Sequence, residues 1–190
     1  MTTEENAMMG RVIEALGGSA AEQEQGEGAG TILSISASLY GSSPVDDDVT
    51  RPTGFDPHAA ALFESIVEAA FLVANADGDF DATERAVFEE IVLRSCDGSV
   101  KREQVAALVA DLEEMLAEDG LEKRARMVAM TVTRPDQAVE VLRVSALIAF
   151  ASEGVSEVER DVLQALASHF SLSPAAVDEA VEQARTVIEG

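Results

Sequence analysis

Residues 73–88, VANADGDFDATERAVF, place four carboxylates within one short stretch: Asp77, Asp79, Asp81 and Glu84. Carboxylates at this spacing repel one another unless a positive charge or a hydrogen-bond donor compensates them. Three explanations are open: the acids bind a cation, they cap the start of a helix, or they are simply solvated. If they bind a cation, an all-carboxylate site favours a hard divalent ion such as Ca²⁺, Mg²⁺ or Mn²⁺.

A second stretch, residues 144–163, repeats the pattern with the sequence VSALIAFASEGVSEVERDVL. In the alignment Glu153 falls opposite Asp77, each followed by a glycine, and Glu159 falls opposite Glu84, each followed by an arginine. A glycine ends a helix at little cost because it adopts a left-handed backbone easily. The sequence therefore predicts two copies of a unit made of a helix, an acid-glycine turn and a second helix.

Both turns contain the spacing of a capping box, in which a side-chain oxygen caps a helix and a glutamate three residues later bonds back. The pairs are Asp81 with Glu84, and Ser156 with Glu159. A cap alone could therefore explain these residues without any metal.

The acid before each glycine is harder to explain in this way. Asp77 and Glu153 each follow a predicted helix, where the negative pole of the helix dipole disfavours an acid. Two acids at matching unfavourable positions suggest a cation nearby. Common descent of two halves with solvated acids is the competing explanation.

An EF-hand is excluded by the spacing. Its loop needs oxygen ligands at positions 1, 3 and 5, a glycine at position 6 and a glutamate at position 12. A loop starting at Asp77 places Ala82 at position 6 and Phe88 at position 12, and starts at Asn75 or Val73 fail as well. A metal could still bind acids from both repeats if the two hairpins pack about a pseudo-twofold axis.

The amino-acid composition limits the classes of molecule that the protein is expected to bind. A formal net charge of -23 would repel nucleic acid phosphates and anionic lipid, and would attract metal cations and basic protein surfaces. The longest apolar runs are too short to span a membrane, so we expect no membrane insertion. Cys96 is the only cysteine, which excludes an internal disulfide and fits a cytoplasmic protein. The acidic N-terminus lacks the basic residues of a secretory signal.

Residues 1–54 differ from the rest of the chain and predict a mostly disordered, acidic N-terminal arm. They contain the string EQEQGEGAG and the run Asp46-Asp47-Asp48. Two pieces could become ordered on the main domain or on a partner. Residues 8–16 have an apolar stripe at helical spacing, and residues 31–40 alternate apolar and small polar residues like a weak strand.

Residues 55–190 predict a single all-α domain of about seven helices with short loops. The helices are expected to begin at Pro57, after Asp81, after Ser99, at Leu121, at Pro135, after Ser156 and after Ser173. The fifth is expected to bury Val139, Leu142, Ala146 and Ala149. The pairs Met8-Met9 and Met127-Met130 are expected to be packing residues and not a soft-metal or tellurium-oxyanion site.

At these residues the sequence resembles the tellurite-resistance protein TerB family, including TerB-like domains joined to J-domain (DjlA-like) co-chaperones. The resemblance rests on VANADGDFDATERAVFEEI at 73–91 and RPDQAVEVLRVSALIAFASEGVSEVERDVLQALASHFSLS at 134–173, and covers roughly 58–188. It implies an all-helical fold with internal two-fold symmetry, and acids of both repeats clustered at a divalent-metal site. The residues that match are Asp77, Glu84, Glu153 and Glu159, with Asp79, Asp81 and Glu157 in the turn of variable length. One departure is Glu153-Gly154, where the family pattern has Asp-Gly.

The favoured hypothesis is a non-enzymatic, divalent-metal-binding interaction module linked to tellurite resistance and the stress response, with a protein partner. The alternative is a metal-independent interaction or co-chaperone-linked scaffold domain, recognising its partner through the arm. An enzyme, such as a metal-dependent hydrolase, is not expected, because His58 and His169 lack ligand spacing and no phosphate-binding loop is present. The sequence leaves the oligomeric state and the identity of the ion open.

Overall fold

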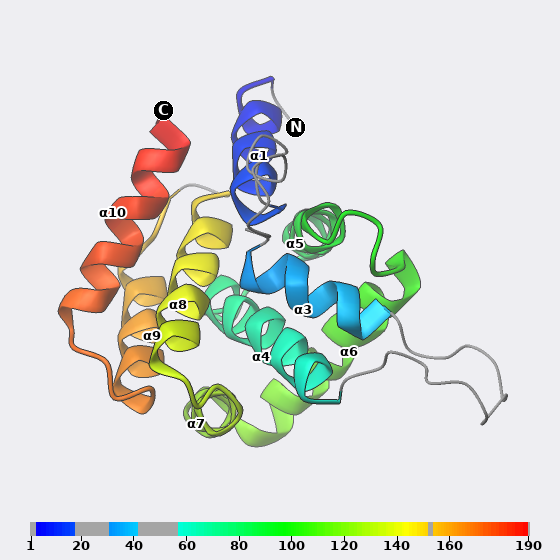
Figure 1. Cartoon of the computed structure of the whole chain (residues 1–190). Helices are drawn as coiled ribbons and strands as arrows, with labels where there is room; N and C mark the ends of the chain where they lie inside the picture. Colours follow the sequence, from blue (N-terminus) through cyan, green and yellow to red (C-terminus); the bar gives the residue numbers. More distant parts are fainter. Residues whose placement is uncertain (1–2, 18–30, 42–56, 152–153, 190) are drawn as a thin grey trace, which may run out of the picture.

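The computed structural model describes residues 3–17, 31–41, 57–151 and 154–189, and all regular secondary structure in these residues is α-helical (Figure 1). From Pro57 onward the seven predicted helices are present, each starting within a few residues of its predicted position. They are α4 (Pro57–Ala74), α5 (Ala82–Ser95), α6 (Arg102–Asp119), α7 (Leu121–Thr131), α8 (Pro135–Phe150), α9 (Glu157–His169) and α10 (Ala175–Glu189). The all-α class is confirmed.

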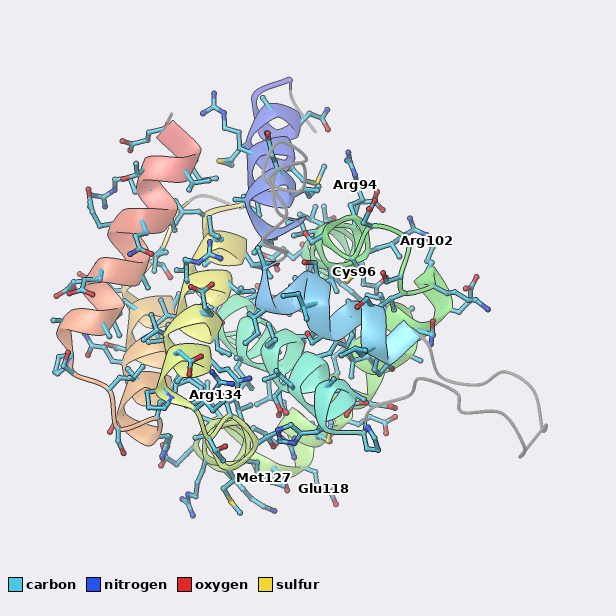
Figure 2. All side chains as sticks on the ribbon, in the orientation of Figure 1. Arg94, Cys96, Arg102, Glu118, Met127 and Arg134 are labelled. Carbon is cyan, nitrogen blue, oxygen red and sulfur yellow. The ribbon has the colours of Figure 1, made fainter. Side chains whose placement is uncertain are left out.

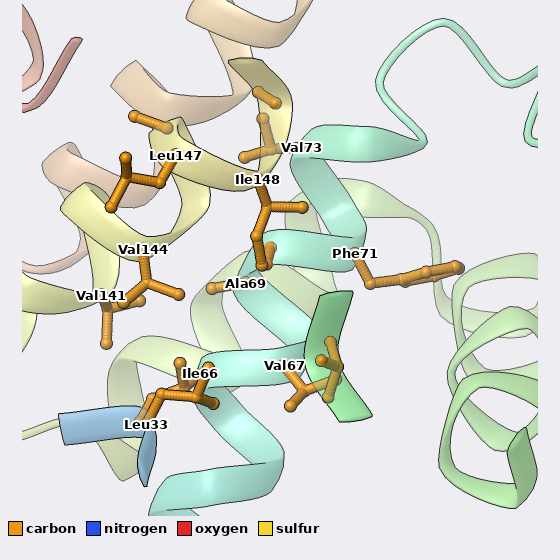
Figure 3. Packing of buried hydrophobic residues seen from close by; sticks show 14 of the residues in the cluster. Leu33, Ile66, Val67, Ala69, Phe71, Val73, Val141, Val144, Leu147 and Ile148 are labelled. Atoms are coloured by element: carbon orange, nitrogen blue, oxygen red, sulfur yellow. The ribbon is translucent and has the colours of Figure 1, made fainter. Parts of the chain in front are cut away.

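Helices α4 and α8, the first helices of the two repeats, form the centre of the molecule and pack extensively against each other. Val73 lies beside Ile148 at one end of the pair, while Ile66 and Val141 lie toward the other end (Figure 3). The two helices therefore run in the same general direction, although they cross at an angle (Figure 1). Because each is followed by an acid-glycine turn, both turns leave the pair at the same end.

Helix α4 is long and apolar enough to pass for a membrane span, although 67% of it is buried inside the protein. Its neighbours explain this composition, because a helix surrounded by other helices is apolar on most of its circumference. Phe63, Ile66 and Phe71 are all fully buried. We therefore interpret α4 as the core helix of the domain.

The two repeats give two three-helix units, α4–α5–α6 and α8–α9–α10, which α7 connects. Their third helices pack differently. Helix α10 lies extensively on α8, whereas α6 makes few contacts with α4 and packs against α5 and α7 instead. A helix from the N-terminal region, α3 (Ile32–Gly41), also packs extensively against α4.

The N-terminal region contains two helices that contribute to the core. Helix α1 (Thr3–Gly17) packs on α5 and α10 and buries Met9, Val12 and Leu16, three residues of the apolar stripe predicted from the sequence. The guanidinium of Arg11 donates a hydrogen bond to the carbonyl of Ile188 in α10. The rest of the predicted disordered arm, residues 1–2, 18–30 and 42–54, lies outside the described residues.

The weak strand expected at residues 31–40 is wrong, because this segment forms α3. Its alternation of apolar and small polar residues also satisfies a helical period. Leu33, Ser36 and Ala37 are buried and Tyr40 is half-buried, at a spacing that places all four on one helical face. Burial against α4 decides in favour of the helix.

The described residues contain one deeply buried ion pair, which ties α7 to α4. The guanidinium Nε of Arg124 lies 2.6 Å from a carboxylate oxygen of Glu68, and the side chains are only 8% and 10% exposed. A second carboxylate, on Asp119, lies 3.2 Å from Arg124. Both charges of the buried pair are thus compensated, as buried charges must be.

Candidate functional site

The first acid-glycine turn begins where α4 ends. Gly78 has φ of 80°, the left-handed region in which glycine carries no side-chain penalty. The carboxylate of Asp77 accepts a hydrogen bond of 3.0 Å from the backbone N–H of Asp79. Both aspartates are exposed. Asp77 therefore stabilises the turn locally, and its remaining oxygen positions face solvent.

Asp81 and Glu84 form the predicted capping box at the start of α5. The Asp81 carboxylate accepts from the N–H groups of Thr83 at 2.6 Å and Glu84 at 2.9 Å, and Glu84 accepts from the N–H of Asp81 at 3.0 Å. The hydrogen bonds from the backbone of Glu84 and Thr83 lower the pKa of Asp81 below its ordinary value. The capping interpretation of these two residues is confirmed.

The second turn also contains a capping box, in which a serine hydroxyl replaces the aspartate carboxylate. Ser156 accepts from the N–H of Glu159 at 3.3 Å, and its own N–H donates to the Glu159 carboxylate at 2.7 Å. Glu157 is exposed in the first turn of α9, and Gly154 has φ of 94°. Glu153, a predicted site residue, lies outside the described residues.

The arginine after each capping glutamate binds a carboxylate on the third helix of its own repeat. Arg85 lies 2.5 Å from Glu113 of α6 and 2.8 Å from Glu89 of its own helix. Arg160 lies 2.5 Å from Asp178 of α10. Each repeat therefore includes a salt bridge from this arginine to the third helix. The sequence indicated this bridge only through two arginines at matching positions.

The described acids do not form a ready-made metal site. Among the residues that the structure places, no group of three or more histidine, cysteine, aspartate or glutamate side chains is arranged to hold a metal ion. Asp81, Glu84 and Glu159 use their oxygens on backbone N–H groups, where a cation would compete with the cap. Asp77, Asp79 and Glu157 are exposed and lack a neighbouring cluster of ligands within the same ranges.

A surface that sequence reasoning missed lies on α7. Met127 is 42% exposed and Met130 is 72% exposed, so the expectation that both are packing residues is wrong. Figure 2 shows Met127 on the outer side of α7, away from the core. The helix buries Arg124, Ala125 and Val128, and this inward face leaves the two methionines on the outer face.

The outer face of α7 also differs in charge from the rest of the protein. Lys123 and Arg126 flank the methionines, and their side chains are 59% and 61% exposed. Each pairs with an acid one turn earlier, Lys123 with Asp119 at 2.5 Å and Arg126 with Glu122 at 3.8 Å. Exposed pairs of this kind contribute little and exchange partners readily. We call Lys123, Arg126, Met127 and Met130 the α7 surface.

A family comparison covers most of the domain. The family described as tellurite resistance protein TerB matches residues 65–185, which extend from α4 to α10 and leave α1 and α3 outside. No curated protein and no solved structure gave a significant match.

Proposed function

The chain belongs to the TerB family, and on that premise we propose that it is a non-enzymatic protein-interaction module of tellurite resistance and the stress response, acting in the cytoplasm. The premise supports a tellurite-resistance-associated domain, and the interaction role is our inference from its surface. The module would recognise its partner directly, without needing a metal ion.

The observation that supports this proposal is the α7 surface. Met130 is the most exposed large apolar side chain among the described residues, at 72%. Methionine is flexible and polarisable, and it is common at surfaces that adapt to a partner. The two methionines add apolar surface on the same side of α7, and apolar surface of this kind is what a protein partner covers.

The charged residues of α7 indicate the charge that a partner segment is expected to carry. Helix α7 carries three bases, Lys123, Arg124 and Arg126, and one acid, Glu122, in a protein of net charge -23. An acidic partner segment is repelled by most of the molecule and least repelled here. The α7 surface is therefore suited to a short segment that combines acids with apolar side chains.

A survival assay tests the proposal. In a strain that lacks the protein, Met127→Glu with Met130→Glu should fail to restore growth on tellurite, while circular dichroism and melting temperature stay close to wild type. The control Met127→Leu with Met130→Leu keeps the apolar surface and should restore growth. Full protection by the glutamate variant would reject the α7 surface as the functional site.

A divalent-metal site remains the second candidate, because α4 and α8 run in the same general direction and an acid-glycine turn follows each of them at the same end of the pair (Figure 3). Such a site would bring Asp77 and Glu153 together. Their approach would have to form on binding, because the described acids are bonded within their own turns. Ion binding would relieve the repulsion between them.

Calorimetry distinguishes the two candidates. Metal-free protein is titrated with Ca²⁺, Mg²⁺ and Mn²⁺, alongside Asp77→Asn with Glu153→Gln. The metal candidate requires binding tighter than about millimolar that this double variant abolishes. The control Glu118→Gln with Glu189→Gln removes the same charge from exposed helical positions elsewhere and should leave binding intact. Absence of binding, or binding that the turn variant leaves unchanged, removes the metal candidate.

A further inference from the structure

A groove lies between α8 and α10, on the opposite side of the sequence repeat from the aromatic turn. Figure 1 shows the two helices side by side, both with their C-terminal ends toward α1, and they pack extensively against each other. The groove has a volume of about 530 Å³ and is lined by Arg143 and Leu147 of α8 and by α10 from Glu179 to Val187. It is open to solvent, so it suits a segment of another protein better than an enclosed small molecule. We call it the α8–α10 groove.

The groove combines a buried apolar base with an exposed apolar edge. Leu147 is fully buried, whereas Val187 is 36% exposed. Val139 lies one turn before Arg143 on α8 and is 41% exposed, so it continues this surface along the same side of the helix. Apolar surface of this kind is what a protein partner covers.

Two polar groups in the walls already have their hydrogen bonds. The guanidinium of Arg143 donates from Nε at 2.9 Å and from Nη2 at 2.8 Å to the carboxylate of Glu140 in its own helix. The hydroxyl of Thr186 donates to the carbonyl of Glu182 at 2.9 Å. A partner therefore does not need to supply hydrogen bonds to these groups.

The carboxylates of α10 are less well compensated. Glu182 lies 3.2 Å from Arg185, with side chains 68% and 48% exposed, and an exposed pair of this kind contributes little. Glu179 makes no hydrogen bond or ion pair within the part of the chain that the structure describes. Arg143 is engaged by Glu140. The groove thus offers two carboxylates of α10 to a cation from outside.

We propose that the α8–α10 groove binds an amphipathic helix of a partner protein, with lysines or arginines beside its apolar face. Its apolar side chains contact Leu147 and Val187, and its cations pair with Glu179 and Glu182. Both walls are helices, and a further helix packs into the groove between their ridges. From Glu179 to Val187, α10 rises ~12 Å, which matches about two turns of such a helix.

Charge selects this occupant over an acidic one. The protein carries a net charge of -23, so a basic helix is attracted from a distance and an acidic helix is repelled. The inference goes beyond the proposed function, because the α7 surface suits a segment that contains acids. The two surfaces would therefore take partners of opposite charge.

A peptide titration of the full-length protein tests the proposal. The probe is a fluorescent peptide, KLLKKLLKKLLK, whose binding is followed by anisotropy. The peptides ELLEELLEELLE and KSSKKSSKKSSK lack the cations or the apolar face, and each should bind at least about tenfold more weakly. Equal binding of KSSKKSSKKSSK would overturn the proposal, because net charge alone would then account for the attraction.

Charge variants of the protein locate the binding surface. Glu179→Gln with Glu182→Gln should weaken binding of the probe about three- to tenfold. The control Glu114→Gln with Glu118→Gln removes the same charge from exposed positions of α6 and should change binding less than about twofold. Equal weakening by the two double variants would reject the groove.

An apolar variant has its own control. Val187→Gln should weaken binding about threefold, because the side chain keeps its length and loses its apolar contact. Val158→Gln changes a valine of similar exposure, 47%, on α9 and should leave binding unchanged. Wild-type binding by Val187→Gln would contradict the proposed apolar contact.

Methyl NMR of the full-length protein shows where the probe binds. The signals of Leu147 and Val187 should shift when the probe is added, and that of Val158 should not. Unchanged Leu147 and Val187 signals would overturn the proposal. If these signals shift with protein concentration in the absence of the probe, a second copy occupies the groove and the partner-helix proposal is wrong.

The α7 surface and the groove are tested separately. The Met127→Glu with Met130→Glu protein should keep the probe-induced shift of Val187, since α7 does not line the groove. Loss of that shift in this variant would contradict an independent groove. Failure of the α7 surface appears in the survival assay, and failure of the groove appears in the titration.

Discussion

Each repeat contains a helix, an acid-glycine turn and a second helix, a unit that we call an elbow. Comparing the two elbows shows which features the fold requires and which residues differ between the repeats. Both elbows have a left-handed glycine, a capping box, and an arginine that reaches the third helix of the repeat. They differ in the cap itself, which is Asp81 in one and Ser156 in the other. The shared features are backbone and packing devices, so much of the repeated acidity serves structure.

The packing beneath the turns also differs. Phe80 of the first turn stacks edge-on against Phe71 at 5.3 Å and Phe88 at 5.9 Å, measured between ring centroids. The second turn has the smaller Val155 at the edge of the core. The first elbow is therefore fixed by a cluster of three phenylalanines, whereas the second has Val155 and the ring of Phe150 beside Gly154.

The largest expected effect concerns a charge that only the first repeat has. Glu68 aligns with Val144, and both are buried. Glu68→Val should lower the free energy of unfolding by about 3–5 kcal/mol, because Arg124 keeps its burial and loses its closest carboxylate. Urea unfolding measures it. The double variant with Arg124→Met should regain much of this loss, and a loss equal to the sum of the two single variants would contradict the pairing.

The aromatic cluster gives the next effect. Phe80→Ala should cost about 2 kcal/mol, below the range for a fully buried phenylalanine because Phe80 is half-buried, whereas Val155→Ala should cost about 1 kcal/mol or less. Thermal and urea unfolding of the two variants compare the elbows directly. Equal losses would show that the aromatic contacts add no stability to the first elbow.

The caps should differ in their response to pH. Because the pKa of Asp81 is lowered in the folded state, its cap stabilises fully above the ordinary value of about 4 and weakens as pH falls through the lowered value. Ser156 does not titrate in this range, and Ser156→Ala should cost about 1 kcal/mol at any pH. In Asp81→Ser, the stability lost between neutral pH and about pH 3 should be smaller than in wild type. An unchanged acid response would contradict the assigned cap.

The smallest effects are expected at the arginine bridges. Arg85 has two carboxylate partners and donates to the carbonyl of Ala106 at 3.3 Å, whereas Arg160 has the single partner Asp178. Arg85→Met should cost about 1 kcal/mol and Arg160→Met less than about 0.5 kcal/mol, with the difference reduced at high salt. Denaturant midpoints at low and high salt measure both. A larger effect at Arg160 would reverse the comparison.

The fold was predictable because its signals are local. Glycines, cap residues and the apolar period located seven helices and both capping boxes, and each of these depends on neighbouring residues alone. Residues 31–40 failed because their pattern fits two periods, and only contact with α4 selects the helix. Val139 was expected in the core and is 41% exposed, although Ala138, Val141 and Leu142 are buried, so it lies on the solvent-facing side of α8.

The candidate site was less predictable for a physical reason. Sequence spacing identifies acids that share a turn, but whether Asp77 and Glu153 could share an ion depends on the distance between two turns. The exposure of Met127 and Met130 was missed because an apolar residue on a helix is usually buried. The apolar period could not identify them, because the inward face of α7 includes the charged Arg124, which the sequence does not place there.

Because α4 and α8 run in the same general direction, their helix dipoles point the same way. In an antiparallel pair the two helix dipoles oppose each other, but here both negative poles, of about half a charge each, lie toward the end that carries the acidic turns. The other end of α8 follows directly on the bases of α7. A freely diffusing protein with this charge distribution is expected to rotate in the electric field of a charged partner before contact. A basic partner would then approach the acid-glycine turns first, and an acidic partner would approach α7 first.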